Sequence, residues 1–205
     1  MGLLDALHAR NVYGRRIEVL ARHLAELLPR DASVLDVGCG DGRLDQVVKG
    51  HRPDLDIEGI DVLLRPRTFI SVKLFDGAVI PHPDRSFDAV TFVDVLHHTH
   101  DPAVLLREAA RVARSCVIVK DHTMDGPLSG PLLRFMDWVG NERHGVVLPY
   151  NYWSSARWSR AFAEVGLTVG EDRRRLGIYP PVADWVFGDG LHRLTRLDVG
   201  GPRHG

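Results

Sequence analysis

The sequence lacks long hydrophobic runs and has few cysteines. Its two cysteines, Cys39 and Cys116, are too few for a disulfide scaffold and cannot form a zinc site on their own. No apolar run approaches the roughly 20 residues that a membrane-spanning helix needs, so we expect no transmembrane segment. The N-terminus carries Asp5 and His8 within its short apolar stretch, which makes it a poor secretory signal. We therefore expect a cytoplasmic protein.

The sequence also lacks an excess of charge of either sign. The formal net charge is −1 and the isoelectric point is about 6.8. Such a chain has no electrostatic footprint for a nucleic-acid backbone, and we expect no nucleic-acid partner. Hydrophobic residues make up 44% of the sequence and charged residues 26%, which excludes wholesale disorder. A chain of 205 residues has room for one domain.

What the sequence does contain is an alternation of helical and strand-like segments. Strongly apolar strands that alternate with helices indicate a parallel sheet covered on both faces. Asp101 and Pro102 form a typical helix start, as the N-cap and the first helical residue. The apolar spacing predicts helices over 15–28, 44–49, 102–113, 132–139 and 155–165, and strands over 33–37, 56–62, 69–75, 87–95, 116–120, 167–174 and 185–197.

A glycine-rich loop follows the first predicted strand, with glycines at Gly38, Gly40 and Gly42. At the carboxyl end of a parallel strand, such a loop lets a ligand lie against bare backbone N–H groups. The dinucleotide-binding pattern would need a third glycine where this chain has Arg43. Asp36, two residues before the first glycine, is unfavourable beside a pyrophosphate but suits a ligand that carries positive charge.

The stretch 34–43 resembles motif I of the class I S-adenosylmethionine-dependent methyltransferases, and the resemblance covers about residues 15–122. It implies a doubly wound, Rossmann-like α/β fold. The sheet would have seven strands, mostly parallel with an antiparallel edge strand, and helices on both faces. It also implies S-adenosylmethionine as cofactor and S-adenosylhomocysteine as product. Further matching stretches are 59–62, 75–77, 84–90 and 94–98.

The resemblance divides the chain into segments of one methyltransferase domain, residues 1–205. The segment before the first strand is helical, and an insertion after the fifth strand serves as a lid or substrate segment. We expect a helical segment over 1–30, a cofactor-binding core over 31–122, the inserted lid over 123–155, a helix and strands over 156–198, and a loose tail over 199–205.

The resemblance also implies the cofactor-binding residues. Asp61 ends the second strand, where a carboxylate can accept hydrogen bonds from both ribose hydroxyls of either NAD or S-adenosylmethionine. Asp76 and Gly77 would meet the adenine, although Asp-Gly is also a plain turn signal. Asp94 would orient the methionine ammonium group or cap its loop. The full set is Asp36, Gly38, Cys39, Gly40, Gly42, Asp61, Val62, Asp76, Gly77, Asp94, Val95 and Leu96.

Several histidines gather after the fourth and fifth predicted strands. No acidic partner has a defined spacing to them, so we expect no metal site. An imidazole titrates near neutral pH and could take a proton from a hydroxyl group or a phenol, which makes His98 and His122 the candidate catalytic bases. The alternative for either histidine is a surface or supporting role, because methyl transfer needs little beyond in-line alignment.

Aromatic residues are concentrated between residues 135 and 162. Such a wall favours a small apolar or aromatic acceptor, although these residues could equally pack the insertion onto the sheet. An oxygen or carbon acceptor atom is favoured, because the Asn-Pro-Pro-aromatic pattern of amino-methylating relatives is absent. We expect a monomer or homodimer. The candidate substrate residues are Tyr13, which we expect to precede the first helix, and Trp138, Tyr150, Tyr152 and Trp153.

Two other functions stay open from the sequence. An NAD(P)-dependent oxidoreductase would share the strand, loop and helix, but Asp36 and Arg43 disfavour it. A module that binds cofactor without turnover would have the same sequence pattern.

Overall fold

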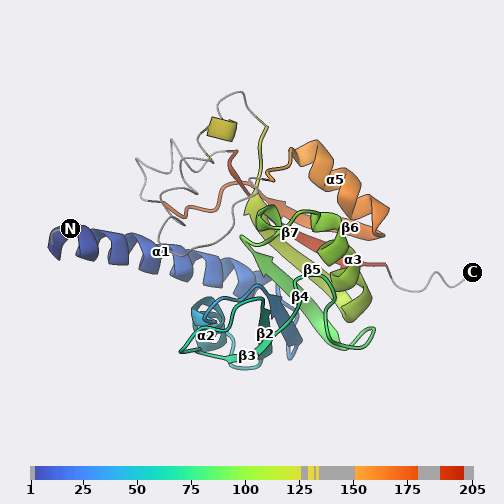
Figure 1. Cartoon of the computed structure of the whole chain (residues 1–205), viewed down its shortest axis with the longest axis horizontal. Helices are drawn as coiled ribbons and strands as arrows, with labels where there is room; N and C mark the ends of the chain where they lie inside the picture. Colours follow the sequence, from blue (N-terminus) through green and yellow to red (C-terminus); the bar gives the residue numbers. More distant parts are fainter. Residues whose placement is uncertain (1–2, 126–128, 132, 134–150, 180–189, 201–205) are drawn as a thin grey trace, which may run out of the picture.

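The computed structural model describes residues 3–125, 129–131, 133, 151–179 and 190–200. Seven strands form one sheet in the order β3-β2-β1-β4-β5-β7-β6 (Figure 1). The strands are β1 (Ser33–Val37), β2 (Asp56–Asp61), β3 (Ser71–Leu74), β4 (Phe87–Val93), β5 (Ala113–His122), β6 (Leu167–Arg173) and β7 (His192–Val199). The helices are α1 (Leu3–Leu27), α2 (Arg43–His51), the short 3-10 helix η1 (Leu96–His98), α3 (Pro102–Val112) and α5 (Ser155–Glu164).

The strand order reverses direction between β1 and β4. From β1 the chain moves outward through β2 to β3, and then returns to place β4 on the other side of β1. Both β2 and β4 pair with β1 in parallel. In open α/β sheets, ligands bind at the carboxyl ends of the strands on either side of such a reversal. The topology therefore directs attention to the ends of β1 and β4.

The predicted seven-stranded, mostly parallel sheet with helices on both faces is confirmed. Its antiparallel strand is β7, which pairs with β5 on one side and with β6 on the other. The antiparallel strand thus lies one place in from the edge, and β6 forms the edge itself.

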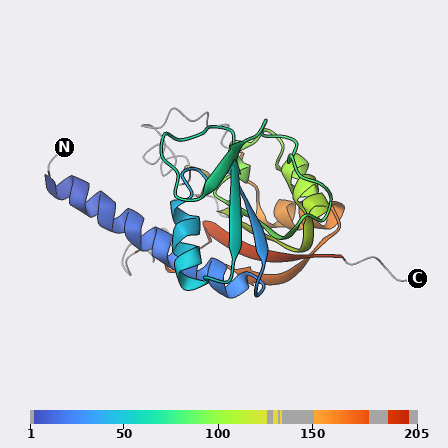
Figure 2. The ribbon, with the colours of Figure 1, turned by 90° about the horizontal axis from the view of Figure 1, so that it is seen from below.

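Two apolar clusters show how the helices cover the sheet. Leu24 on α1 and Val48 on α2 pack against Val34 and Ile118 on one face. On the other face, the apolar sides of α3 and α5 pack against alternating residues of the same strands, such as Leu35. Figure 2 shows α1 and α2 together on one side and α3 and α5 on the other. Alternation of buried side chains along each strand is what a sheet covered on both faces requires.

The first helix is longer than the apolar spacing over 15–28 predicts. α1 begins at Leu3, so the prediction that it starts near residue 15 is wrong, and Tyr13 lies inside the helix instead of before it. Gly14 obscured this continuity, because glycine disfavours a helix interior by about 1 kcal/mol. The N-terminal part of α1 projects beyond the sheet in both views (Figures 1 and 2).

Other element boundaries agree more closely with the sequence. Asp101 caps α3, where its side chain accepts a hydrogen bond from the backbone N–H of Ala103. The predicted helix over 132–139 and the predicted strand start at 185 fall largely outside the described residues. Within the described ranges, no helix combines the length and apolarity needed to cross a membrane.

Candidate cofactor and acceptor site

A cavity of about 600 Å³ lies at the switch point between β1 and β4. The glycine loop forms one wall, and residues of α1 and of the loop after β2 form others. The cavity brings together five of the predicted cofactor-binding residues, namely Asp36, Gly38, Cys39, Gly40 and Asp94. Sequence reasoning did not single out the rest of its lining, which is Arg16, Ile17, Leu20, Asp41, Leu44, Arg65, Pro66, Arg67 and Val93.

The glycine loop leaves open space where a ligand would lie. Gly40 has φ +61°, and a Cβ atom added there would meet no atom within 4 Å. By contrast, a Cβ atom on Gly42, at φ +73°, would lie 2.4 Å from the side chain of Ile70. Gly42 is thus required by packing and backbone conformation, whereas Gly40 exposes bare backbone to the cavity. The acids of the cavity wall fit the cationic groups of a cofactor, and arginines on the same wall fit a carboxylate.

Asp61 fixes the glycine loop from the end of β2. Its Oδ2 accepts a hydrogen bond of 2.8 Å from the Gly40 N–H, and its Oδ1 accepts one of 2.9 Å from Leu63. Asp76 also accepts backbone N–H groups, from Ala78 and Val79, and these bonds lower its pKa. The lining of the cavity does not include Asp61 or Asp76, nor Val62 and Gly77. Val62 is 60% exposed and lies against Gly77, on the β3 side of the loop.

Asp36 is paired with a second buried acid, Asp45, in the first turn of α2. Burial raises the pKa of Asp36 to about 7, although hydrogen bonds from Thr91 and Asp45 oppose the shift. Burial and the neighbouring Asp36 raise the pKa of Asp45 well above its usual range. The sequence analysis missed Asp45. Its only signal was a carboxylate three residues before Val48, on the buried side of a short helix.

Asp94 lies between the cavity and a cluster of basic groups. Its backbone has φ +57°, and its carboxylate contacts Lys120 and Arg16. Burial alone would raise the pKa of Asp94, but the charges of Lys120 and Arg16 outweigh burial and hold that pKa well below its usual range. Asp94 is therefore anionic at neutral pH.

Lys120 and two histidines complete what we call the Lys120 cluster, which is Asp94, Lys120, His122 and His192. Lys120 is fully buried, and its Nζ lies 3.3 Å from His192 Nδ1. His122 Nε2 lies 3.5 Å from Asp94 Oδ1. Burial, followed by the charge of Lys120, lowers the pKa of His122 and of His192 well below the usual histidine range. Both imidazoles are therefore neutral at pH 7.

A second pair joins η1 to β5 beside this cluster. His97 Nδ1 lies 2.6 Å from Asp121 Oδ1, and Asp121 also accepts the backbone N–H of Leu96. Leu96 is fully buried in the core, and Val95 packs against Gly38. In the parts of the chain that the structure describes, no three His, Cys, Asp or Glu side chains are arranged to hold a metal ion.

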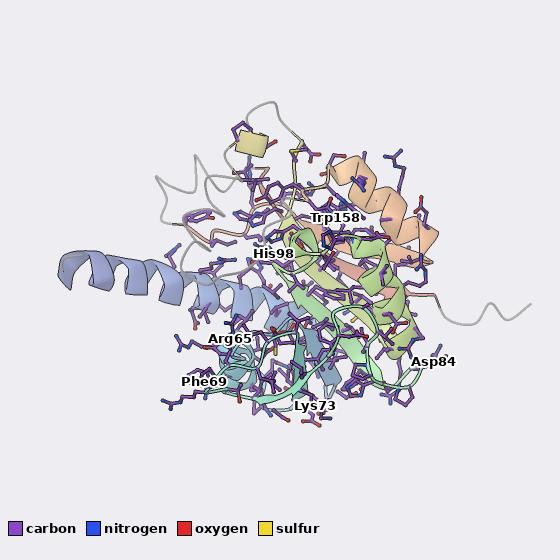
Figure 3. The ribbon with its side chains drawn as sticks, in the orientation of Figure 1. Arg65, Phe69, Lys73, Asp84, His98 and Trp158 are labelled. Carbon is purple, nitrogen blue, oxygen red and sulfur yellow. The ribbon has the colours of Figure 1, made fainter. Side chains whose placement is uncertain are left out.

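The two predicted bases occupy different environments. His122 is buried between the rings of His97 and His192, with ring centroids at 4.9 Å from both. His98, which is labelled in Figure 3, lies on η1 and is half-buried. Its ring lies 3.9 Å from that of His97. His122 contacts a residue of the cavity wall, namely Asp94.

The predicted substrate residues are placed unevenly. The ring of Tyr152 lies 5.7 Å from His97 and 6.1 Å from His122, next to the candidate base. Trp153 packs into the main core, with its ring 4.8 Å from that of Trp158. Trp138 and Tyr150 lie outside the described residues, as does the side chain of Tyr13 on α1.

Arginines on the cavity wall are the other functional candidates that sequence reasoning missed. Arg16 comes from α1, and Arg65 and Arg67 come from the loop after β2. The guanidinium of Arg67 lies 5.5 Å from the ring of Phe69 in the same loop, and that of Arg43, the first residue of α2, lies 4.9 Å from the same ring. Isolated arginines carry no spacing signature, so only the folded chain reveals them.

Comparison with known proteins identifies the class that this fold and cavity define. A sequence model described as a methyltransferase domain matches residues 8–171. The chain therefore belongs to the methyltransferase-domain family, and its resemblance to the class I S-adenosylmethionine-dependent methyltransferases is confirmed. S-adenosylmethionine is the methyl donor of this class, and S-adenosylhomocysteine is the product.

Individual relatives give the range of similarity. The chain is 27% identical over 158 residues to 2-methyl-6-phytyl-1,4-hydroquinone methyltransferase from Synechocystis sp., covering 68% of this chain and 44% of the relative. It is 31% identical over 112 residues to ubiquinone biosynthesis O-methyltransferase from Pseudoalteromonas translucida, covering 48% of this chain and 45% of the relative. The chain thus spans less than half the length of these curated relatives.

A solved structure supports the fold over nearly the whole chain. It comes from the Haloferax volcanii complex that contains the Trm112 methyltransferase activator. The match has a TM-score of 0.71 at 18% identity and covers 98% of this chain and 97% of the other. Identity this low shows a shared fold alone.

Proposed function

We propose that the protein transfers the methyl group of S-adenosylmethionine to an oxygen or carbon atom of a small, planar, apolar acceptor. The observation that carries the proposal is the cavity itself: bare backbone at Gly40 lies beside Asp36, and Asp94 on the same wall contacts neutral His122. One side of Asp94 thus suits the cofactor and the other suits the acceptor. We also propose that the protein is cytoplasmic.

Charge complementarity supports a specific orientation of the cofactor. Its methionine end is a zwitterion that also carries the sulfonium, and the cavity wall offers both signs of charge. Asp36 and Asp94 suit the cationic groups, and Arg16 suits the carboxylate. Asp61 is close enough to the loop to receive the ribose hydroxyls. Val62, Asp76 and Gly77, which lie together on the β3 side, would receive the adenine.

His122 is the proposed general base when the acceptor atom is a hydroxyl oxygen. The bound cofactor supplies an activated methyl group, whose C–S bond breaks as the new C–O bond forms. His122 Nδ1 is buried, and no hydrogen-bond partner for it exists within the described ranges. A neutral imidazole nitrogen without a partner can take the hydroxyl proton, while Asp94 faces the other ring nitrogen.

Two relatives direct the choice of acceptor. Both act in quinone chemistry by name, one on a hydroquinone and one as an O-methyltransferase. Tyr152 and His97 stack beside His122, and all three side chains are buried, so the surroundings of the proposed base are aromatic and largely excluded from water. We therefore propose a phenol or hydroquinone ring as the acceptor class.

The test supplies isotope-labelled S-adenosylmethionine with substituted hydroquinones, catechols and, as a contrast, short oligonucleotides. Label on an oxygen or carbon atom of the aromatic acceptors is the expected result, and mass spectrometry with NMR identifies the atom. The His122→Asn variant should lose about a hundredfold in kcat. His100→Asn, on an exposed side chain between η1 and α3, is the control and should match wild type. Cofactor binding without transfer to any acceptor would instead support a non-catalytic module.

A further inference from the structure

Two buried carboxyl groups face each other beneath the glycine loop. Asp36 is the penultimate residue of β1 and Asp45 lies in the first turn of α2; each is 4% exposed, and each shifts the pKa of the other. Thr91 donates a 2.6 Å hydrogen bond to Asp36 Oδ1. Asp45 Oδ2 is buried, and the described part of the chain offers it no hydrogen-bond partner. We call Asp36 and Asp45 the acid pair.

Two carboxylates in contact inside a protein repel each other, which strongly disfavours ionisation of both while no cation lies beside them, so the acid pair retains a proton at neutral pH in the ligand-free protein. The neighbouring charges reinforce this state, since Asp61 acts on Asp36 and Asp41 acts on Asp45, and both are negative. The ionisable groups around the pair are Asp61 from β2, Cys39 and Asp41 from the loop, and, on the wall of the same cavity, Arg16 from α1 and Asp94 after β4.

We propose that Asp45 is a positioning residue that sets the cofactor preference of this site. With the cavity empty it shares a proton with Asp36, and it gives that proton up when a sulfonium-bearing ligand enters. The inference rests on the proposed function, because it assigns the cavity beside Asp36 to the methionine end of S-adenosylmethionine. Asp45 does not line the cavity and acts through Asp36.

The difference between cofactor and product gives this pair its selectivity. Both ligands carry an ammonium and a carboxylate group, but only S-adenosylmethionine carries the sulfonium charge. A cation beside Asp36 favours its carboxylate form, so the proton passes to the buffer as the cofactor binds. Because the thioether of S-adenosylhomocysteine is neutral, binding of the product releases a smaller fraction of a proton. The protein therefore binds the cofactor more tightly, relative to the product, as the pH rises.

The expected pH dependence of cofactor affinity follows from the release of one proton on binding. Burial raises the pKa of Asp36 to about 7. Below that pH, cofactor affinity should rise with pH by up to about tenfold per unit, because one proton leaves for each ligand that binds. The corresponding slope for S-adenosylhomocysteine should be clearly smaller. Product inhibition should therefore weaken from pH 6 to pH 8.

Isothermal titration calorimetry tests the proposal with the full chain. Titrations of S-adenosylmethionine and S-adenosylhomocysteine at about pH 6.5, in two buffers of different ionisation enthalpy, count the protons released. Wild type should release close to one proton with the cofactor and fewer with the product. Asp45→Asn should release almost none with either ligand, since an amide donates to Asp36 and leaves it ionised. Asp56→Asn, which removes an exposed carboxylate at the start of β2, is the control and should behave like wild type.

The outcomes distinguish failure of the acid-pair proposal from failure of the proposed function. Equal proton release with both ligands in wild type would overturn the role of the acid pair, and this measurement does not depend on whether a variant folds. Wild-type proton release from a folded Asp45→Asn protein would overturn the assignment to Asp45. No binding of either ligand to folded wild type would overturn the proposed function instead.

Discussion

Two buried polar clusters flank the wall of the cavity, and they neutralise charge in opposite ways. In the acid pair, Asp36 and Asp45 hold a proton between them, because both are buried and the charges that act on them are negative. In the Lys120 cluster, Asp94 keeps its charge because Lys120 and Arg16 balance it. An aspartate side chain thus titrates near neutral pH in the acid pair, whereas in the Lys120 cluster it stays anionic at neutral pH.

The two clusters therefore suit different roles. A group that titrates near pH 7 responds to the charge of an incoming ligand, as the cofactor side requires. A balanced ion pair does not respond, and so can hold the neighbouring His122 in a fixed, neutral state for an acceptor. The following experiments test the two clusters separately, and then the residues of the cavity wall between them.

The largest expected effect is the loss of the buried cation. Lys120→Met leaves Asp94 without its main partner in a site where Lys120 is fully buried. Removing one member of a buried ion pair costs about 3–5 kcal/mol, so the free energy of unfolding in urea should fall by about that amount. Lys73→Met, in a largely exposed pair with Glu58, is the control and should change stability by less than about 1 kcal/mol. Similar losses in both variants would show that the Lys120 cluster is not held by charge.

The sequence predicted the frame that holds these clusters but not the clusters themselves. Alternating apolar segments and the glycine loop predicted the parallel sheet, and Asp36 two residues before Gly38 predicted an acidic ligand site. The cluster around Lys120 depends on β7, which inserts between β5 and β6 and brings His192 beside Lys120. No local spacing links residues 72 positions apart.

Asp45 shows a second limit of sequence reasoning. A lone carboxylate in a short amphipathic helix is usually solvent-exposed, and only the packing of α2 beneath the loop turns Asp45 toward Asp36. Trp153 shows the converse, since an aromatic residue in the predicted pocket wall packs into the core. Composition identifies an aromatic-rich segment, but the face on which each ring lies depends on tertiary contacts.

The second prediction is that the two clusters give opposite pH dependences of stability. In the acid pair the folded protein binds protons that the unfolded chain has already lost. The pair's contribution to the free energy of unfolding should therefore fall as pH rises from about 4 to about 7, by up to about 1.4 kcal/mol per pH unit for each proton. His122 is neutral when folded but protonates below its usual pKa when unfolded, so its contribution should fall as pH drops below about 6.5.

Difference curves separate the two contributions. Urea unfolding of the ligand-free protein between pH 4 and pH 8 gives the wild-type curve. Subtracting the Asp45→Asn curve should leave a difference that falls with pH, and subtracting the His122→Asn curve should leave one that rises with pH. Two differences of the same sign would contradict the contrast between the clusters.

A smaller effect is expected at the bare backbone of the loop. Gly40→Ala places a methyl group in open space at φ +61°, where the left-handed backbone costs about 1–2 kcal/mol. The methyl group also fills the open space beside the loop, so S-adenosylmethionine should bind at least about tenfold more weakly by calorimetry. Gly50→Ala, also in open space but in the helix α2, is the matched control. It should keep wild-type affinity and gain up to about 1 kcal/mol of stability. Unchanged affinity in Gly40→Ala would place the cofactor elsewhere.

The smallest effect on stability is expected at Arg16, a residue of α1 that lines the cavity and contacts Asp94. Arg16 is 37% exposed, and an ion pair that water reaches is worth no more than about 1 kcal/mol. Arg16→Gln should therefore leave Asp94 ionised by Lys120 and reduce the free energy of unfolding only slightly. Its main effect should be weaker binding of both cofactor and product, because each carries the carboxylate that Arg16 is proposed to receive. Arg22→Gln, in an exposed pair on the same helix, is the control for both measurements. A stability loss as large as that of Lys120→Met would mean that both cations are needed to stabilise the Asp94 carboxylate. In that case Arg16 could not leave Asp94 to bind the cofactor carboxylate without destabilising the Lys120 cluster.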